Sequence, residues 1–286
     1  MLALDNKTVR QAFNRAASSY DEYAILHREL AQRLMQRLEL IKIAPKNILD
    51  LGAGTGYLSQ LLHQRFPTTN IYNIDFAEKL LHVARTKYNK ISQLHAICAD
   101  ISKLPIISDS VDMVVSSMTL QWIADLPLLF SEVRRVLHVN GLFMFTTVGP
   151  DTLKEIRHAW QHIDRDTHVH EFIDMHDIGD MLQAQRFLDP VMDAYFMTLT
   201  YSSIANALND IRKIGAYNNA QQRPRTLMGK QRYHDFLQAY EQYRNAQGKI
   251  PVSYEIVSGH AWKSQPASRM EDGIVKIDVN QIKRTF

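Results

Sequence analysis

The sequence has only one cysteine, Cys98, so no disulfide can form within the chain. It also lacks any run of the roughly 18 to 20 apolar residues that a membrane-spanning helix requires. Residues 1–10 contain no apolar core of the kind that marks an export signal. These absences lead us to expect a protein of the reducing cytoplasm, in which Cys98 is a small core residue near a strand end rather than a reactive thiol.

A strong charge of one sign is absent as well. The 33 basic and 30 acidic residues leave a net charge of +3, which by itself does not indicate a nucleic-acid partner. The charge is uneven, because residues 210–249 carry eight basic and three acidic residues. The basic ones are Arg212, Lys213, Arg223, Arg225, Lys230, Arg232, Arg244 and Lys249. This segment is either a solvated helical face or a docking surface for an acidic partner.

Apolar residues make up 45% of the chain, which is enough for a sizeable core. Short apolar runs predict strands at 47–51, 71–75, 94–99, 111–116 and 142–148, the last after a turn at Asn140-Gly141. Segments with helical spacing separate them at 57–66, 77–88 and 127–137. This alternation predicts an α/β fold with a doubly wound, mostly parallel sheet.

Further elements flank this core. Helical spacing predicts helices at 9–20 and 22–43 before the sheet, and at 151–163 and 175–185 after it. Two late β-like runs, 190–201 and 252–262, would complete seven strands. We therefore divide the chain into N-terminal helices (1–45), a core (46–201), a helical insertion that forms a cap (202–249), a last core strand (250–262) and a polar tail (263–286).

The most informative motif is the run Asp50-Leu51-Gly52-Ala53-Gly54-Thr55-Gly56. Its glycines let the chain turn sharply and bring its backbone close to a ligand, and Gly56 lets the next helix pack tightly. Asp75 and Asp100 end the next two strands, at the same edge of a parallel sheet. An acid at the position of Asp75 can accept both hydroxyls of a ribose. The pattern predicts a nucleoside site at this edge.

The spacing of the glycines narrows the ligand. Gly-x-Gly-x-Gly differs from the Gly-x-Gly-x-x-Gly of dinucleotide enzymes, because its third glycine comes one residue early. Asp50 would repel a pyrophosphate but suits a ligand with an ammonium group. S-adenosylmethionine has that group and no phosphate, so the pattern favours it as the cofactor.

In these motifs, and in the segment 112–122, the sequence resembles the class I S-adenosylmethionine-dependent methyltransferases, whose sheet is Rossmann-like. The resemblance implies that Gly52 and Gly54 lie under the methionine portion and that Asp75 holds the ribose. Asp100 would bind the adenine beside Ile101, and Ser116 would lie near the sulfonium. Tyr20, at the end of the first predicted helix, would either close over the methionine end or only pack there. The implied cofactor-binding set is Tyr20, Asp50, Gly52, Ala53, Gly54, Gly56, Asp75, Phe76, Asp100, Ile101 and Ser116.

A closer resemblance is to the malonyl-acyl-carrier-protein O-methyltransferases of biotin synthesis. It rests on the opening run from Val9 to Tyr20, on Leu120-Gln121-Trp122, and on three later segments. These are Phe145-Thr146-Thr147, His158-Ala159-Trp160-Gln161 and Ile211-Arg212-Lys213-Ile214-Gly215-Ala216. A related branch, the mitochondrial respiratory-complex assembly factors, shares Gly149-Pro150-Asp151-Thr152-Leu153.

The resemblance implies methyl transfer to the free carboxylate of malonyl-acyl carrier protein, which starts pimeloyl synthesis. A carboxylate is already ionised at neutral pH, so the reaction needs alignment rather than a general base. Arg212, or alternatively Arg15, would hold that carboxylate. Gln121 and Trp122 would wall the transfer site or merely pack in the core. Since acyl carrier proteins are acidic, the basic segment 210–249 would dock the carrier.

Two other functions stay open: a methyltransferase for a small quinone-type precursor, and a non-methylating assembly factor with the same fold. No membrane or nucleic-acid partner is expected. The run His168-Val169-His170 suggests a metal, but no acid or cysteine stands at ligand spacing and the reaction needs none. We therefore expect no metal site, and expect both histidines to be loop or pocket residues.

Overall fold

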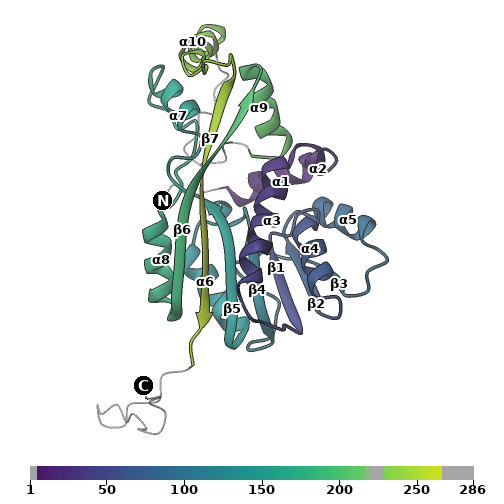
Figure 1. The fold of residues 1–286 in the computed structure, drawn as a ribbon. Helices are drawn as coiled ribbons and strands as arrows, with labels where there is room; N and C mark the ends of the chain where they lie inside the picture. Colours follow the sequence, from purple (N-terminus) through teal and green to yellow (C-terminus); the bar gives the residue numbers. More distant parts are fainter. Residues whose placement is uncertain (1–4, 217, 219–228, 266–286) are drawn as a thin grey trace, which may run out of the picture.

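The computed structural model describes residues 5–216, 218 and 229–265. Its centre is a seven-stranded sheet in the order β3-β2-β1-β4-β5-β7-β6 (Figure 1). The first five strands are parallel, and β7 lies antiparallel between β5 and β6. The doubly wound, mostly parallel sheet predicted from the sequence is therefore confirmed. The strands are β1 (Asn47–Leu51), β2 (Asn70–Asp75), β3 (Leu94–Cys98), β4 (Val111–Ser117), β5 (Leu137–Val148), β6 (Phe187–Tyr201) and β7 (Ile250–Lys263).

Helices cover both faces of the sheet. On one face α3 and α4 pack against β1, β4 and β5, and on the other face α6 and α8 do so. The helices are α1 (Asn6–Ala16), α2 (Tyr20–Tyr23), α3 (Ile25–Glu39), α4 (Tyr57–Arg65), α5 (Glu78–Lys87), α6 (Leu126–Val136), α7 (Lys154–Gln161), α8 (Met175–Ala184), α9 (Ile204–Lys213) and α10 (Lys230–Glu241), with a 3₁₀ turn at Leu120–Trp122. None of the described helices is long and apolar enough to cross a membrane.

The strand sequences explain why both faces are covered. In β4, Met113 and Val115 join the apolar cluster under α3 and α4, whereas Val114 joins the cluster under α6 and α8. Successive side chains of a strand point to opposite faces of the sheet. An unbroken apolar run therefore places apolar side chains on both faces, and both must be covered by helices. All three side chains are 0–1% exposed.

The last two strands extend beyond the parallel sheet. Figure 1 shows α7, α9 and α10 gathered around the upper ends of β6 and β7; we call these three the upper helices. They share an apolar cluster of their own, in which Trp160, Phe236 and Tyr240 are buried. The Tyr240 hydroxyl donates to the Pro251 carbonyl at 2.8 Å and ties α10 to β7.

The structure corrects several details of the sequence analysis. The first helix ends at Ala16, so Tyr20 begins α2 rather than ending that helix. The turn expected at Asn140 lies inside β5, as a residue with φ of 63°. Cys98 is exposed, because β3 is the edge strand, and not in the core. Lys263 belongs to β7, and the rest of the predicted tail from residue 266 lies outside the described residues.

Candidate active site

Three hollows adjoin at the edge where the parallel strands end. The glycine-loop cavity is lined by Gly52, Gly54, Asp75, Phe76, Asp100 and Ile101, among others. A smaller recess, the Asp50 recess, adjoins it at Gly52, Gly54 and Tyr20. A large cavity of about 570 Å³ opens beneath the upper helices. Predicted cofactor residues from β1, β2, α2 and the loop after β3 therefore converge on one edge of the sheet.

Gly52 shows why this loop needs glycine. Its φ is +72°, and a Cβ atom there would lie 2.0 Å from Oγ1 of Thr119. The Gly52 amide donates to the Ile74 carbonyl at 2.8 Å, which holds the loop against β2. A side chain at this position would clash within the protein as well as with a ligand on the loop.

Asp75 lies at the end of β2 and is 5% exposed. Its carboxylate accepts the Gly54 amide at 2.9 Å and the Ala77 amide at 2.7 Å. Burial raises the pKa of Asp75 to about 6, and these backbone hydrogen bonds oppose part of the rise. A carboxylate offers about four acceptor positions, so two remain for a pair of ligand hydroxyls.

Asp50 is the most buried acid of the site, at 1% exposed. The Ser59 hydroxyl donates to it at 2.6 Å and also lies 2.7 Å from the Asn73 side-chain oxygen. Burial raises the pKa of Asp50 to about 7. The carboxyl group lines the Asp50 recess together with Ala53. An ammonium group placed there would supply the positive charge that this acid lacks.

The short helix α2 covers the glycine loop. Asp21 accepts a hydrogen bond from the Thr55 hydroxyl at 2.5 Å and forms an ion pair with Lys87 at 2.8 Å. Tyr20 thereby lies over the loop, 4.0 Å from where a Cβ atom of Gly54 would be. Its ring lines both the glycine-loop cavity and the Asp50 recess. Burial, with Asp75 and Asp21 nearby, raises the pKa of Tyr20, which keeps the phenol neutral.

The remaining predicted cofactor residues differ in their placement. Asp100 accepts hydrogen bonds from the backbone amide and hydroxyl of Ser102 and lies beside the buried Ile101. Gly56 is the N-cap of α4 and packs against α5 rather than lining the cavity. Ser116 is fully buried and donates to the Leu51 carbonyl at 2.9 Å. Ser117, one residue later, lines the cavity instead.

An aromatic wall divides the glycine-loop cavity from the large cavity. Phe13, Met118 and Trp122 line both. The Phe13 and Trp122 rings meet edge to face, with centroids 5.4 Å apart. Beside this wall, Gln121 donates to the Met118 carbonyl at 2.8 Å and accepts from Thr147 at 3.1 Å. Two groups that react with each other, one bound in each cavity, would meet at this wall.

Gly215 joins two distant segments of the chain. It follows α9 with φ of +80°, and a Cβ atom there would lie 3.1 Å from the Phe13 ring and 3.3 Å from the Phe13 backbone. The absence of a side chain lets the end of α9 pack directly on α1. The opening helix and the Ile-Gly-Ala segment, which are 200 residues apart in the sequence, are therefore parts of one site.

The large cavity is mainly apolar and has few charged groups. Arg212 lines it, is exposed, and makes no ion pair with a described acid. Arg232 also lines it but is bound to Asp164 and Asp166. Arg15 is exposed, hydrogen bonds Gln11, and lines none of the three hollows. Of the two arginines expected to hold a carboxylate, only Arg212 faces the cavity.

Two histidines also line the large cavity: His170, which the sequence analysis expected to be a loop or pocket residue, and His27, which it did not single out. His170 is 6% exposed and packs on Trp122 at 5.2 Å, and its Nε2 has no partner among the described residues. Burial and Arg157 lower the pKa of His170 to about 4. Burial likewise lowers the pKa of His27 to about 4. Both rings are therefore neutral at pH 7 and cannot supply positive charge to the cavity.

The expectation that no acid stands at ligand spacing from the histidines was wrong. Asp164 lies 2.9 Å from His168, and the loop between them brings Asp166 within the same cluster. Arg232 of α10 donates to both carboxylates, so an arginine already supplies positive charge to this group. Trp160 stacks on His168 with ring centroids 3.7 Å apart. The cluster thus fastens α10 to the loop after α7.

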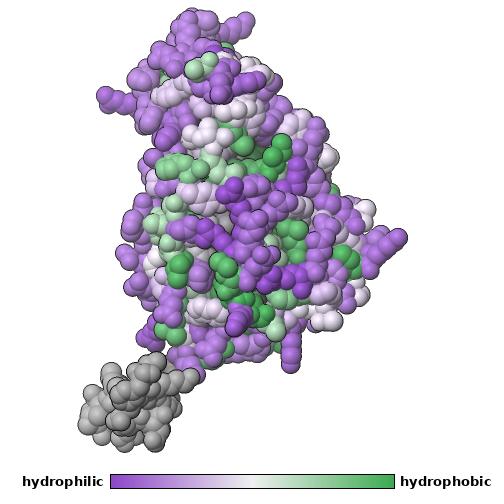
Figure 2. Space-filling model, viewed as in Figure 1, coloured by the Kyte–Doolittle hydropathy of each residue, from purple (hydrophilic) through white to green (hydrophobic). Residues whose placement is uncertain are grey.

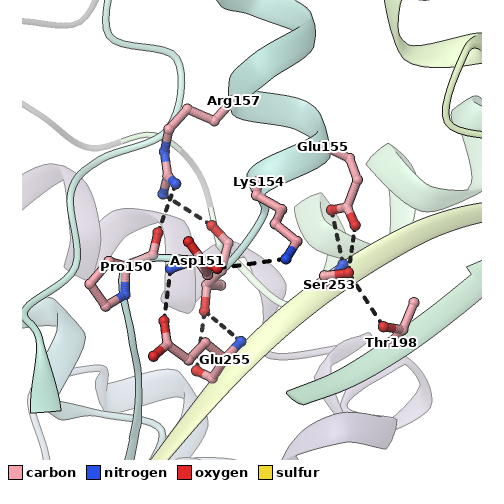
Figure 3. A network of polar contacts seen from close by, with 9 residues as sticks. Pro150, Asp151, Lys154, Glu155, Arg157, Thr198, Ser253 and Glu255 are labelled. Atoms are coloured by element: carbon pink, nitrogen blue, oxygen red, sulfur yellow. Dashed lines mark hydrogen bonds and ion pairs between the residues drawn. The ribbon is translucent and has the colours of Figure 1, made fainter. Parts of the chain in front are cut away.

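A polar network fixes the loop between β5 and α7 (Figure 3). Arg157 donates to the Pro150 and Thr152 carbonyls at 2.7 and 3.0 Å, and Glu255 accepts the Asp151 amide at 2.8 Å. On the other side of α7, the buried Glu155 accepts the backbone amide and the hydroxyl of Ser253. Because Thr152 and the neighbouring Leu153 line the large cavity, the network sets the position of its wall.

The residues of the glycine-loop cavity and the Asp50 recess fit S-adenosylmethionine. Asp75 has acceptor positions for a ribose, apolar Phe76 and Ile101 suit a base, and Asp50 suits an ammonium. Fold and site together define a class I S-adenosylmethionine-dependent methyltransferase. A family model described as a methyltransferase domain matches residues 49–145. Its similarity to curated relatives over almost its whole length shows that the chain belongs to the malonyl-[acyl-carrier protein] O-methyltransferase family.

The relatives match almost the whole chain. The enzyme of that name from Gallionella capsiferriformans is 43% identical over 269 residues, which cover 92% of each chain. The one from Halorhodospira halophila is 38% identical over 285 residues, which cover 99% of this chain and 97% of the other. Among solved structures, the YcgJ protein from Bacillus subtilis shares the fold with a TM-score of 0.59 at 17% identity. The match covers 82% of this chain and 99% of the YcgJ chain.

A second solved structure shares the fold more distantly. It is phosphoethanolamine N-methyltransferase 2 from Haemonchus contortus in complex with S-adenosyl-L-methionine, with a TM-score of 0.51 at 16% identity. The match covers 82% of this chain and 52% of that one. The chain is an S-adenosylmethionine-dependent O-methyltransferase.

Proposed function

We propose that the enzyme methylates the free carboxylate of a malonyl group carried on acyl carrier protein, and so makes the methyl ester that starts pimeloyl synthesis for biotin. The observation that carries this proposal is the large apolar cavity with Arg212 as its unpaired cation among the described residues. The curated relatives are named for this substrate. A long uncharged arm with one carboxylate at its end has the chemistry that this cavity would bind.

The protein's contribution is alignment and charge. Bound S-adenosylmethionine supplies an electrophilic methyl group. A malonyl carboxylate is ionised at neutral pH, so no side chain has to remove a proton. The planar guanidinium of Arg212 would hold it through two hydrogen bonds and offset the cost of taking its charge out of water. Trp122, in the wall between the two cavities, would keep water away from the transfer.

The carrier protein would dock on the basic end of the upper helices. Lys213 lies beside Arg212 at the end of α9, and Lys230 begins α10. Neither lysine makes an ion pair with a described acid, so both charges are available to an acidic partner. Arg223 and Arg225, which also belong to the expected basic surface, lie outside the described residues.

The test is methylation of malonyl-acyl carrier protein by Arg212→Met, with Lys213→Met as the matched control. Loss of a bidentate contact to a buried carboxylate predicts a fall in kcat/KM of roughly 10- to 100-fold for Arg212→Met. Cofactor affinity should stay unchanged, and Lys213→Met should retain most of its turnover at a saturating carrier concentration. Unchanged methylation by Arg212→Met would remove its assignment.

The same assay separates the other two functions. Methylation of a small quinone precursor without a carrier protein would favour the small-molecule enzyme. Cofactor binding without any malonyl methylation would favour an assembly factor. Growth of a biotin-requiring strain that lacks this methyltransferase, restored by the gene for this chain, would support the proposed substrate in the cell.

A further inference from the structure

His170 is a buried polar side chain to which neither the fold nor the proposed reaction gives a partner. It lies in the loop between α7 and α8, is 6% exposed, and lines the large cavity. Its Nε2 atom is enclosed without a hydrogen-bond partner among the described residues, and its Nδ1 atom forms no hydrogen bond with them either. A buried polar group without a partner costs free energy, which a ligand with the right acceptor would recover.

The surroundings of the His170 ring determine which nitrogen a ligand would meet. Burial and Arg157 lower the pKa of His170 to about 4, so at pH 7 the ring is neutral and has one N–H. A proton on the enclosed Nε2 would have no acceptor, so we assign it to Nδ1, the nitrogen that is not enclosed. A neutral donor of this kind suits an uncharged acceptor such as a carbonyl oxygen.

The position of His170 places this donor near the transfer site. Its ring packs on Trp122, with centroids 5.2 Å apart, and on Phe172, with centroids 4.6 Å apart. Trp122 belongs to the wall between the two cavities. The part of a substrate that lies beside this wall is the part that reacts, so His170 would meet the malonyl end rather than the carrier end.

Other polar side chains of the lining are already engaged. Gln121 uses its side-chain nitrogen and oxygen within the protein. The Thr152 hydroxyl donates to the Glu255 carbonyl and accepts the Glu255 amide. His168 is bound to Asp164. A carbonyl group that enters this mainly apolar cavity loses its hydrogen bonds to water, and His170 offers a donor that no described residue occupies.

We propose that His170 binds the substrate by donating a hydrogen bond from Nδ1 to the thioester carbonyl oxygen of the malonyl group. This inference rests on the proposed malonyl substrate. The carbonyl is one methylene away from the carboxylate that Arg212 would hold, so the two contacts would fix both ends of the malonyl unit. Because Trp122 and Phe172 hold the ring before the substrate arrives, the contact costs little conformational entropy.

The experiment compares two carrier substrates in steady-state methylation. One is malonyl-acyl carrier protein, and the other carries a carboxyethyl thioether, in which a methylene replaces the thioester carbonyl and the carboxylate is kept. His170→Phe keeps an aromatic ring against Trp122 but has no donor. It should lower kcat/KM for the malonyl substrate roughly 10-fold and leave that for the carboxyethyl substrate nearly unchanged. Any difference in intrinsic reactivity between the substrates cancels, because it is the same for both proteins.

Two further variants separate the hydrogen bond from packing. His170→Asn keeps a side-chain N–H close to the position of Nδ1 and should retain more malonyl turnover than His170→Phe. His158→Phe makes the same exchange at an exposed residue of α7 that lines none of the three hollows, and should behave as the wild type does. Cofactor affinity, measured by calorimetry, should be the same in all four proteins.

The contrary results can be told apart. An equal fall for both substrates in His170→Phe, or an equal loss in His170→Asn and His170→Phe, would assign the effect to packing and overturn the proposal. Unchanged malonyl turnover in His170→Phe would overturn it as well, while the proposed function would stand. If the wild-type protein did not methylate malonyl-acyl carrier protein, the proposed function itself would fail and this inference with it.

Discussion

At the scale of single residues, the site places two acids where their charge is costly. Burial raises the pKa of Asp50 to about 7 and that of Asp75 to about 6. In the unfolded chain each would titrate near ~3.9. The unfolded state therefore loses these protons at a lower pH than the folded state does. Both acids stabilise the free protein below about pH 4, and this contribution is lost as the pH rises through 6 and 7.

Asp50→Asn removes one of these ionisations and should change how stability depends on pH. We expect the free energy of unfolding of the variant, relative to the wild type, to rise between pH 4 and pH 8, by on the order of 2 to 4 kcal/mol. Urea unfolding of both proteins across this range, without cofactor, is the measurement. Asp100→Asn, at an exposed carboxylate of the same edge, is the control. A difference that does not vary with pH would contradict the assignment.

Several site residues could be predicted from the sequence because chain order alone determines their neighbours. Asp75 follows its strand directly, and parallel strands end at one edge, so its meeting with the glycine loop was predictable. Ser116 and Ser117 differ because alternate strand residues point to opposite sides, and the sequence did not say which one faces the cavity. The pairing of Arg232 with Asp164 depends on how the upper helices pack, which no local pattern encodes.

At the scale of elements, the cluster of Asp164, His168 and Arg232 holds α10 against the loop after α7. The Asp164 side chain is 15% exposed and bonds both His168 and Arg232. Arg232 keeps the pKa of this carboxyl group below its usual value, against the effect of burial. Since Trp160, His168 and Phe236 also line the large cavity, the position of α10 determines the shape of that cavity.

Arg232→Met should therefore loosen α10 without unfolding the core. The variant leaves Asp164 and Asp166 without their cation, so their repulsion should open the contact. We expect faster amide hydrogen exchange in α10 and in residues 164–168, with unchanged exchange in β1 and β4. Arg244→Met, which loses an exposed pair with Glu241 and hydrogen bonds to the Ser202 and Gly248 carbonyls but no contact with residues 164–168, is the comparison variant. Equal exchange in Arg232→Met and the wild type would show that apolar packing alone holds the helix.

The elements themselves were largely predictable. Apolar runs in β1 and β4 indicated their strands because both faces of a parallel sheet are buried. The boundaries near residue 20 were wrong, because the helical spacing continues across a break that separates α1 from α2. The place of β7 between β5 and β6 was not predictable either, since pairing between distant strands leaves no mark in either sequence.

At the scale of the whole molecule, the chain divides its task between two regions. The parallel sheet and its loops form the two hollows that fit the cofactor, and the ends of β6 and β7 support the upper helices over the large cavity (Figure 1). Figure 2 shows a largely hydrophilic surface on this face, with hydrophobic side chains gathered below the upper helices. Both regions meet at Trp122, so methyl donor and acceptor would approach from opposite sides of one aromatic wall.

This division predicts that salt affects the two substrates differently. Charges on α9 and α10 would attract an acidic carrier over a distance, and salt shortens that reach from about 10 Å at 0.1 M to about 3 Å at 1 M. Cofactor binding would rely on buried groups such as Asp50 and Asp75, which salt screens much less. We therefore expect kcat/KM for malonyl-acyl carrier protein to fall steeply with salt, while cofactor affinity changes little.

Malonyl-N-acetylcysteamine, a thioester with a short neutral arm and no carrier protein, separates docking from chemistry. Its turnover should be slow at every salt concentration but nearly independent of salt. Lys213→Gln combined with Lys230→Gln should flatten the salt dependence for the carrier substrate alone, because fewer charges then attract the carrier. If carrier turnover in the wild-type protein were as insensitive to salt as that of the short thioester, the upper helices would not be the docking surface.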